Sequence, residues 1–247
     1  MIEIIPLTGI GEVLPGSDLA AILADAMREA AIEPAAGDVL VVTQKIVSKA
    51  EGRFVDLDAV EPGAAAIALA TKTRKDPRLV ELVLRESTDV VRAVPNVLIT
   101  RQMAGHVMAN AGIDRSNIGG GSGEQALLLP VDADSSAERL RRALGDRCAV
   151  VISDSFGRPW RYGVVNVAIG VAGMPSLIDR RGDLDRDGRR LEVTQIALGD
   201  MVATAAGLAM GEGAEGIPAV LVRGMAWSGP DAAASALVRP LAEDLFQ

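Results

Sequence analysis

Carboxylates beside small residues recur at three places along the chain. Asp114 lies in the stretch Asn-Ala-Gly-Ile-Asp-Arg-Ser-Asn, Asp154 and Ser155 follow an apolar run, and Glu212 lies in the glycine-rich segment 210–218. Carboxylate oxygens bind hard cations, and glycines let backbone amides approach phosphate oxygens. The pattern predicts a site for a metal and a nucleotide. Turn formation is the alternative interpretation of the two aspartates, since aspartate also caps backbone amides.

The chain has no standard phosphate-binding loop. None of its four lysines follows a glycine, so the Walker motif is absent. Gly211, Gly213 and Gly216 have the spacing of the dinucleotide fingerprint, but they follow a predicted helix, whereas that fingerprint precedes one. Their amides can still form an anion-binding nest. Lys49, just past a predicted strand, could place its charge on a phosphate or remain solvated.

Three further polar features favour structural roles. The acidic run that starts at Asp183 imitates a calcium loop, but Thr194 stands where the closing glutamate belongs, so a polar loop is favoured. His106 is the only histidine, which excludes a multi-histidine metal site, and we interpret it as a residue on a strand face. Cys148 is the only cysteine, so no intramolecular disulfide can form, and its apolar neighbours indicate a buried thiol.

Composition bounds the class of protein. The 247 residues are 49% hydrophobic but only 2% aromatic, so Ala, Val, Leu and Ile must fill a substantial core. A net charge of -8 argues against general nucleic-acid binding, although a local positive pocket remains compatible with it. There is no signal-peptide pattern, and no apolar run approaches the roughly 20 residues that span a bilayer. We therefore expect a cytoplasmic protein without a membrane partner.

The pattern of elements is mixed, without a regular β–α repeat, which indicates an α+β fold. Short consecutive strands between residues 88 and 109 favour antiparallel pairing, and 119–123 is predicted to be a loop. The predicted strands are 38–43, 88–92, 97–101, 106–109, 148–153 and 219–223. The predicted helices are 18–31 capped by Ser17 or Asp18, 76–85 with Pro77 first, 135–145 from a Ser135–Glu138 capping box, 192–210 stopped by Gly211, and one from 231 disturbed at Pro240.

Seven motifs in order along the whole chain resemble one enzyme family. They are Pro-Leu-Thr-Gly-Ile-Gly-Glu-Val at 6–13, Val-Ser-Lys-Ala-Glu-Gly-Arg at 47–53, the stretch 110–117, Leu-Leu-Leu-Pro at 127–130, Asp-Ser-Phe-Gly-Arg at 154–158, the segment 185–194 and the segment 210–218. With them the chain resembles the GTP-dependent coenzyme F420-0:L-glutamate ligases, which are gamma-glutamyl ligases of deazaflavin coenzyme biosynthesis.

The resemblance implies a fold and an assembly. It implies an α+β fold of mixed, largely antiparallel sheets with flanking helices, in two interlocked subdomains that together form a single ligase domain over residues 1–247. It also implies a homodimer. Some relatives fuse a flavin-reductase-like domain to this one, and we expect the stand-alone ligase domain here.

The resemblance also implies the site. Asp114 and Asp154 would hold one divalent cation, and Ser155 and Glu212 a second, with Mg²⁺ or Mn²⁺ as the metals and K⁺ as a further candidate. Asp114, Asp154 and Lys49 would be the catalytic residues. Family members often carry Ser or Thr in place of Gln44, and Thr in place of Ser155. The residues implied for GTP are Ile10, Gly11, Glu12, Val13, Gln44, Lys49, Asn117, Met210, Gly211, Glu212, Gly213, Ala214, Glu215, Gly216 and Ile217.

The implied reaction joins an acid to an amino acid. GTP would phosphorylate the terminal carboxylate of the deazaflavin precursor, and the amino group of L-glutamate would attack the acyl phosphate, releasing phosphate. Arg158, Arg161, Arg189 and Arg190 are candidates for binding the substrate carboxylates. Two other classes remain open: another metal-dependent GTP-using kinase or phosphohydrolase, and a non-catalytic module that binds a nucleotide or a deazaflavin.

Overall fold

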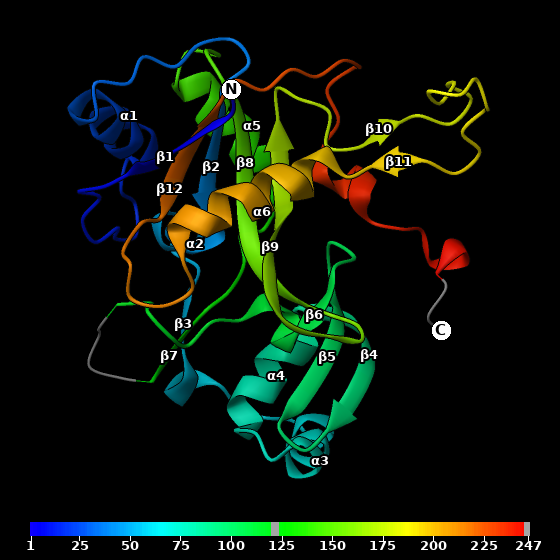
Figure 1. Ribbon diagram of the computed structural model, residues 1–247. Helices are drawn as coiled ribbons and strands as arrows, with labels where there is room; N and C mark the ends of the chain where they lie inside the picture. The colour runs from blue at the N-terminus through cyan, green and yellow to red at the C-terminus, as the bar shows by residue number, and fades with distance from the viewer. Residues whose placement is uncertain (120–123, 245–247) are drawn as a thin grey trace.

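A five-stranded mixed sheet forms the centre of the computed structural model, which describes residues 1–119 and 124–244 (Figure 1). The α+β class expected from the sequence is confirmed. Neighbouring strands are antiparallel except β2 and β8, which are parallel. The strand order is β1 (Glu3–Leu7), β12 (Ala219–Arg223), β2 (Val39–Thr43), β8 (Ala149–Arg158) and β9 (Arg161–Ala172).

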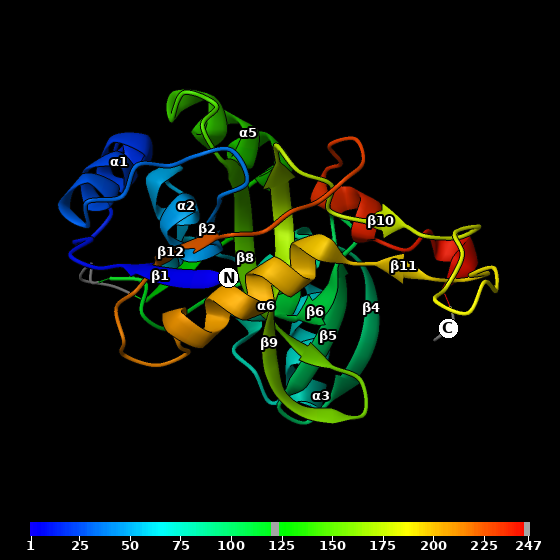
Figure 2. The same ribbon diagram turned by 45° about the horizontal axis from the view of Figure 1, so that its top comes forward.

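Helices cover both faces of this sheet. Leu40 and Val42 of β2 face one hydrophobic cluster, and Val39 and Val41 face the other, as strand alternation requires. All four side chains are buried, which explains why β2 reads as a continuous apolar run. Figure 2 shows the two layers: α1 (Leu19–Glu29), α2 (Gln44–Ala50) and α5 (Ala133–Ala143) on one side, and α6 (Leu198–Met210) on the other.

A second group of elements has its own hydrophobic cluster, which includes Leu79, Val80 and Leu98. Its three strands are antiparallel, as the sequence predicts for this region. Asp76 caps the second helix and accepts a hydrogen bond from the Arg78 amide, as expected for an Asp-Pro start. The elements are β4 (Ser87–Val94), β5 (Val97–Gln102), β6 (Val107–Ala109), α3 (Ala64–Thr73) and α4 (Pro77–Arg85), joined to the main sheet through β3 (Phe54–Asp56), β7 (Gln125–Leu127), η1 (Leu57–Ala59) and η2 (Asn110–Gly112).

The structure corrects the predicted start of two helices. The capping box at Ser135 is wrong, because α5 begins at Ala133 and Asp132 is its cap, accepting a hydrogen bond from the Ser135 amide. The long helix starts at Leu198 instead of residue 192, because residues just before it pair in the small antiparallel sheet of β10 (Ile178–Asp179) and β11 (Gln195–Ile196). Its end at Gly211 is confirmed.

Two other predicted elements differ from the structure: one strand is longer than expected, and one α-helix is absent from the residues described. The strand expected to stop at residue 153 continues to Arg158, because β9 supplies hydrogen bonds along that length. The C-terminal helix expected from residue 231 is replaced by two short turns, η3 (Ala234–Leu237) and η4 (Leu241–Glu243). Positions 120–123 of the predicted loop lie outside the described residues. Within residues 1–119 and 124–244, no helix has the length and apolarity to cross a bilayer.

Candidate active site

Four chain segments meet at one end of the central sheet. The parallel pair of β2 and β8 ends with Thr43 opposite Ser153. Ala219 of the antiparallel β12 lies between Val42 and Leu7, so β12 begins where β1 and β2 end. The chain on either side of these positions is therefore brought together. The segments are 10–13 after β1, 44–49 after β2, 154–155 in β8, and 210–218 between α6 and β12.

A cavity of about 440 Å³ lies where these segments meet. Of the residues that the sequence resemblance assigns to metals or GTP, every one lines this cavity except Ala214. The lining also includes residues that the sequence reasoning did not assign: Thr43, Lys45, Ile46, Ser116, Ser153, Asn166 and Pro218.

Asp154 lies on β8 just beyond the last pair with β2, so this part of the strand has a neighbour only on the β9 side. The pKa of its carboxyl is raised to about 7, mainly by burial and next by the negative charge of Asp114. Lys45 opposes the shift and Glu212 adds to it. Burial and neighbouring negative charge therefore outweigh the positive charge near the Asp154 carboxylate, a condition that a bound cation would relieve.

Asp114 is held from two sides. Its backbone exchanges two hydrogen bonds of 2.9 Å with Leu127. Its Oδ2 atom accepts a 2.8 Å hydrogen bond from Gln44 and lies 3.4 Å from the Lys45 ammonium. The Ser48 hydroxyl donates to the side-chain oxygen of Gln44, which fixes the direction of the side-chain amide. Gln44 thus orients a carboxylate, a contact that the sequence alone does not reveal.

Lys49 is buried, with a side chain only 6% exposed, and pairs with Glu12 at 2.6 Å. This burial excludes the solvated lysine that was open at the sequence level. The Glu12 side chain is 56% exposed, so the carboxylate reaches the ammonium from the solvent side. An incoming anion could take the place of Glu12 without moving Lys49.

The glycine-rich turn after α6 presents backbone amides to the cavity. Gly211 has φ +71°, and a side chain there would collide with the Glu215 carboxyl. Glu215 accepts a 2.8 Å hydrogen bond from the Gly213 amide, and Asn117 donates to the Gly213 carbonyl at 3.3 Å. One amide of this turn thus already binds a carboxylate oxygen.

Comparison with known proteins decides the family. The family model for F420-0:gamma-glutamyl ligase matches residues 9–224. The chain is 46% identical to the coenzyme F420:L-glutamate ligase of Methanopyrus kandleri over 100% of this chain and 97% of that protein. It is 41% identical to the ligase of the same name from Methanothermobacter thermautotrophicus, over 100% of this chain and 99% of that protein. It is 45% identical to that of Natronomonas pharaonis, over 98% of this chain and 93% of that protein. The chain belongs to the F420-0:gamma-glutamyl ligase family. It is therefore a ligase enzyme.

The metal ligands expected for this ligase offer oxygen atoms only. Asp114, Asp154, Ser155 and Glu212 all line the cavity. Among the described residues, no group of three or more His, Cys, Asp or Glu side chains is placed to hold a metal on its own. Oxygen donors are the ligands that a hard cation such as Mg²⁺ prefers, and one or two carboxylates usually hold it together with substrate phosphates and water.

Four arginines of this ligase were candidates for the substrate carboxylates, and none lines the cavity. Arg158 donates to the Tyr162 carbonyl at 3.1 Å, and Arg190 to the Gly182 carbonyl at 3.1 Å. Arg161 begins β9, and Arg189 lies in the β10–β11 connection. Their part in substrate binding stays a prediction.

Three other residues that the sequence drew attention to, Asp185, His106 and Cys148, do not line the cavity. Asp185 accepts hydrogen bonds from the Asp187 and Arg189 amides, so the calcium-like run is a polar turn. His106 lies just before β6, its ring edge-on to Phe156 at 5.8 Å. Burial raises the pKa of the Cys148 thiol to about 11, which leaves it without nucleophilic character.

Two of the seven unassigned cavity residues, Lys45 and Asn166, were missed for different reasons. Lys45 follows Gln44 directly, so its position after a buried strand was a signal that could have found it. Asn166 lies opposite Ser155 in the β8–β9 pairing, 13 residues after the predicted strand end at residue 153. Only the register of that pairing reveals it.

Proposed function

We propose that this ligase adds L-glutamate to the deazaflavin precursor coenzyme F420-0, and then further gamma-linked glutamates, with GTP as the energy source. GDP and phosphate would be the other products. The names of the family and of the full-length relatives support the acceptor and the amino acid. The charge balance of the cavity supports the nucleotide and the metals.

That charge balance is the observation that carries the proposal. Five carboxylates line the cavity, and only two ammonium groups accompany them: Glu12, Asp114, Asp154, Glu212 and Glu215 against Lys45 and Lys49. A triphosphate is itself strongly negative, so such a cavity would repel it on its own. Divalent cations reverse this, because they bind the carboxylates and the phosphate oxygens together. The site therefore suits a metal–nucleotide complex better than a free anion.

The alternation of β8 supports two separate cations. Successive side chains of a strand point to opposite faces, so Asp154 and Ser155 face different sides of β8. The charge of Asp114 acts more strongly on Asp154 than that of Glu212 does, and Glu212 follows the end of α6, the helix on the other face of the sheet. We propose Asp114 and Asp154 for one Mg²⁺ or Mn²⁺, and Ser155 and Glu212 for the second. K⁺ is a further candidate for this site.

The proposed chemistry is phosphoryl transfer followed by aminolysis. An oxygen of the acceptor carboxylate attacks the γ-phosphorus of GTP, and the bond to the GDP oxygen breaks. The glutamate amino nitrogen then attacks the acyl carbon, loses a proton, and expels phosphate. Divalent cations would neutralise charge on the transferred group. The chain would supply Lys49 and the Gly213 amide as donors to phosphate oxygens, and this positioning is most of what such a reaction requires.

We also propose that the ligase forms a homodimer, as the family resemblance implies. The hairpin between β8 and β9 extends beyond the central sheet (Figure 1), and Tyr162 near its tip is fully exposed. Val164 on the same hairpin is 47% exposed. Light scattering of the purified protein tests this, and a monomer at micromolar concentration would contradict it.

The decisive experiment supplies the four components and reads product masses. The purified protein is incubated with coenzyme F420-0, L-glutamate, GTP and Mn²⁺, and parallel reactions omit GTP or the metal. Stepwise addition of glutamyl units that requires both would support the proposal and give the number of glutamates. GDP formation without a gain in mass would instead favour a kinase or phosphohydrolase. Neither GDP nor product from a folded protein would favour a binding module.

A further inference from the structure

The segment that carries Asp114 touches the nucleotide cavity through contacts that a ligand would disturb. Ser116 accepts a 2.7 Å hydrogen bond from the Lys45 ammonium at its carbonyl, and Asn117 donates to the Gly213 carbonyl. Lys45 also lies 3.4 Å from Asp114. A cation on Asp114 repels this ammonium, and a phosphate attracts it. The cavity side alone therefore gives the segment an anchor that weakens when ligands bind.

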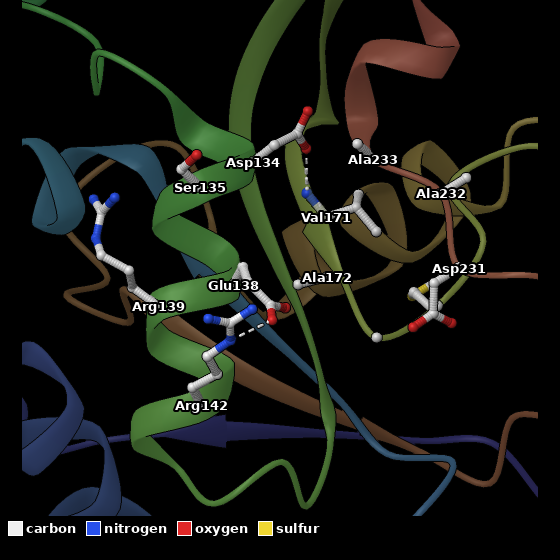
Figure 3. Close-up of a pocket in the computed structure, with 12 residues that line it drawn as sticks. Asp134, Ser135, Glu138, Arg139, Arg142, Val171, Ala172, Asp231, Ala232 and Ala233 are labelled. Atoms are coloured by element: carbon white, nitrogen blue, oxygen red, sulfur yellow. Dashed lines mark hydrogen bonds and ion pairs between the residues drawn. The ribbon is translucent and has the colours of Figure 1, made fainter.

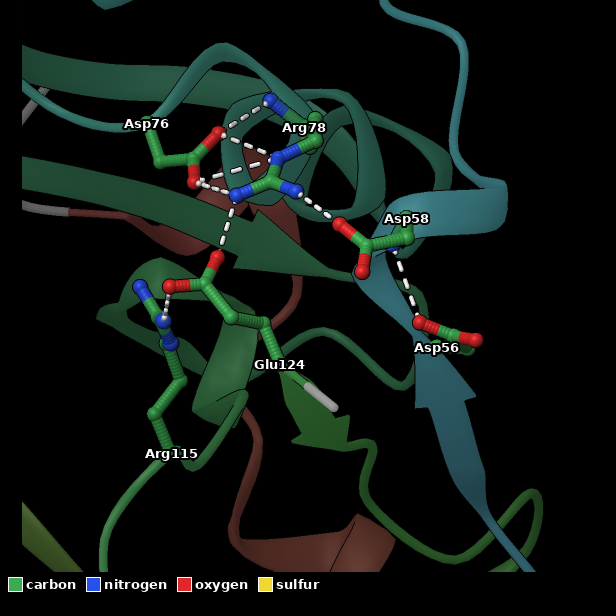
Figure 4. Close-up of polar contacts among 6 residues, drawn as sticks. All are labelled: Asp56, Asp58, Asp76, Arg78, Arg115 and Glu124. Atoms are coloured by element: carbon green, nitrogen blue, oxygen red, sulfur yellow. Dashed lines mark hydrogen bonds and ion pairs between the residues drawn. The ribbon is translucent and has the colours of Figure 1, made fainter. Parts of the chain in front are cut away.

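The opposite side of the segment has a different anchor, which does not line the cavity. A guanidinium nitrogen of Arg115 lies 3.6 Å from one oxygen of Glu124, and the other oxygen of Glu124 accepts from Arg78 (Figure 4). One carboxylate thus joins two guanidinium groups. The backbone of Glu124 is fixed too, since its carbonyl accepts a 2.8 Å hydrogen bond from the Leu57 amide.

Arg78 is the fixed end of this chain of contacts. It is the second residue of α4, and besides Glu124 it binds Asp58 at 2.5 Å and Asp76 at 2.7 Å. Asp76 also caps the helix through the Arg78 amide, so the guanidinium and the helix start share one partner. The hydrogen bond from Arg78 lowers the pKa of the Asp76 carboxyl, and the charge of Arg115 contributes to this. Three carboxylates therefore hold one guanidinium in place.

We propose that Arg115, Glu124 and Arg78 form a positioning brace that keeps Asp114 and Asn117 in place when a cation and a nucleotide enter the cavity. The brace rests on the function proposed above for the cavity itself. None of its three side chains lines that cavity, so ligands do not compete for them. It ties the segment to α4 and its separate hydrophobic cluster, a support that ligand binding leaves unchanged.

The chain offers a matched pair of variants. Glu124→Gln and Asp58→Asn each remove one negative charge from Arg78, but only Glu124 also contacts Arg115. Amide hydrogen exchange across 113–119 in the ligand-free protein should become several-fold faster in Glu124→Gln and remain unchanged in Asp58→Asn. This readout does not depend on any activity.

The second readout is the Mn²⁺ dependence of GTP-dependent glutamate addition. An exposed ion pair contributes up to about 1 kcal/mol, so Glu124→Gln should raise the Mn²⁺ concentration for half-maximal rate by about three- to fivefold. The rate at saturating Mn²⁺ should stay within about twofold of wild type, because the brace touches no reacting atom. Arg115→Ala should raise the Mn²⁺ concentration for half-maximal rate by the same factor, and combining it with Glu124→Gln should raise that concentration no further. Arg115→Lys should raise it less than Arg115→Ala does.

The outcomes separate the brace from the proposed function. Exchange in Glu124→Gln equal to wild type, or Asp58→Asn equal to Glu124→Gln in either readout, would overturn the brace. An unchanged Mn²⁺ dependence together with faster exchange would overturn its positioning role. A wild-type protein that neither binds nor uses GTP with Mn²⁺ would overturn the proposed function, and the exchange comparison would still decide whether the brace holds the segment.

Discussion

The two ends of the central sheet contain cavities that differ in charge more than in size. The cavity of about 510 Å³ at the start of β8 and end of β9 is the larger, and that at the other end measures about 440 Å³. In the larger one, Asp134 accepts hydrogen bonds from the Val171, Ala234 and Ser235 amides. Figure 3 shows Asp134 turned to the Val171 amide, and Arg142 bonded to Glu138.

In the smaller cavity, Asp114 and Asp154 have fewer such partners than Asp134 has. Asp154 has a pKa raised to about 7. Asp114 accepts one hydrogen bond from the Gln44 side chain and lies near one ammonium, that of Lys45, which also bonds the Ser116 carbonyl. Carboxylates that already accept several amide hydrogen bonds hold the fold together, whereas carboxylates left without compensation are ready to bind a cation. We therefore propose that weakly compensated charge, and not volume, marks the functional end of the sheet.

Among the variants that test this contrast, Asp154→Asn should have the largest effect. Loss of a cation ligand should reduce glutamate addition on the order of 10³-fold, since a bound cation contributes several kcal/mol to stabilising transition-state charge. The metal-free variant should melt at or above the wild-type temperature, because the substitution removes a charge that burial and the neighbouring acids disfavour. The comparison breaks if the folded variant keeps near-normal ligation in Mg²⁺.

Lys49→Met tests the positive side of the same cavity. Removal of the buried ammonium should weaken GDP binding in Mn²⁺ by about 10- to 100-fold, the range expected for one hydrogen bond to a charged group. Titration calorimetry measures it. Lys72→Met is the control, because Lys72 lies exposed on α3. Equal affinities of the two variants would show that Lys49 does not contact the nucleotide.

Asp134→Ala tests whether the acid of the larger cavity stabilises the fold. It leaves three backbone amides without an acceptor, so the free energy of unfolding should fall by about 2 kcal/mol. Urea titration measures this change. The affinity of the folded protein for Mn²⁺ and GDP should stay at the wild-type value. A folded variant with much weaker GDP binding would mean that the larger cavity also serves the reaction.

The pH dependence of stability gives the smallest expected effect. Folding raises the Asp154 pKa from 3.8 to about 7, so the folded protein binds more protons than the unfolded chain between these values. Without metal, this group therefore reduces stability as pH rises from about 4 to 7, and its full cost remains above pH 7. Wild type and Asp154→Asn should agree at low pH and diverge upward through this range. A constant difference in melting temperature would contradict the raised pKa.

Metal should reverse this dependence. A cation and a proton compete for the same carboxylate, so apparent Mn²⁺ affinity should rise with pH until about pH 7. Binding below that pH should release a proton, which calorimetry in buffers of different ionisation enthalpy detects. Proton release from Asp154→Asn equal to that of wild type would place the titration elsewhere.

Local signals in the sequence were sufficient for several elements and for the kind of chemistry. The Asp-Pro start of α4, the stop of α6 at Gly211 and the buried strand β2 all depend on residues within a few positions of each other. The family resemblance brought together acids, a lysine and glycines that line one cavity. The roles of these residues stay predictions.

Tertiary structure decided what depends on partners far along the chain. β8 continues past Ser153 because β9 pairs with it, and that extension places Asp154 inside a strand. Asp132 displaces Ser135 as the cap of α5, and residues expected in α6 pair instead as β11. The same holds for the burial of Lys49 and for the bond from Gln44 to Asp114.

The sequence by itself thus determined the α+β class, half of the described strands, four of the described α-helices and the oxygen-rich residue types that line the cavity. The tertiary structure revealed the remaining elements, among them β1, β9, α2 and α3, and decided where elements end, how far each carboxylate is compensated, and which side chains orient it. The physical reason is that helix caps and apolar periodicity act between neighbours in the chain. Strand pairing, burial and charge compensation act between segments that only folding brings together.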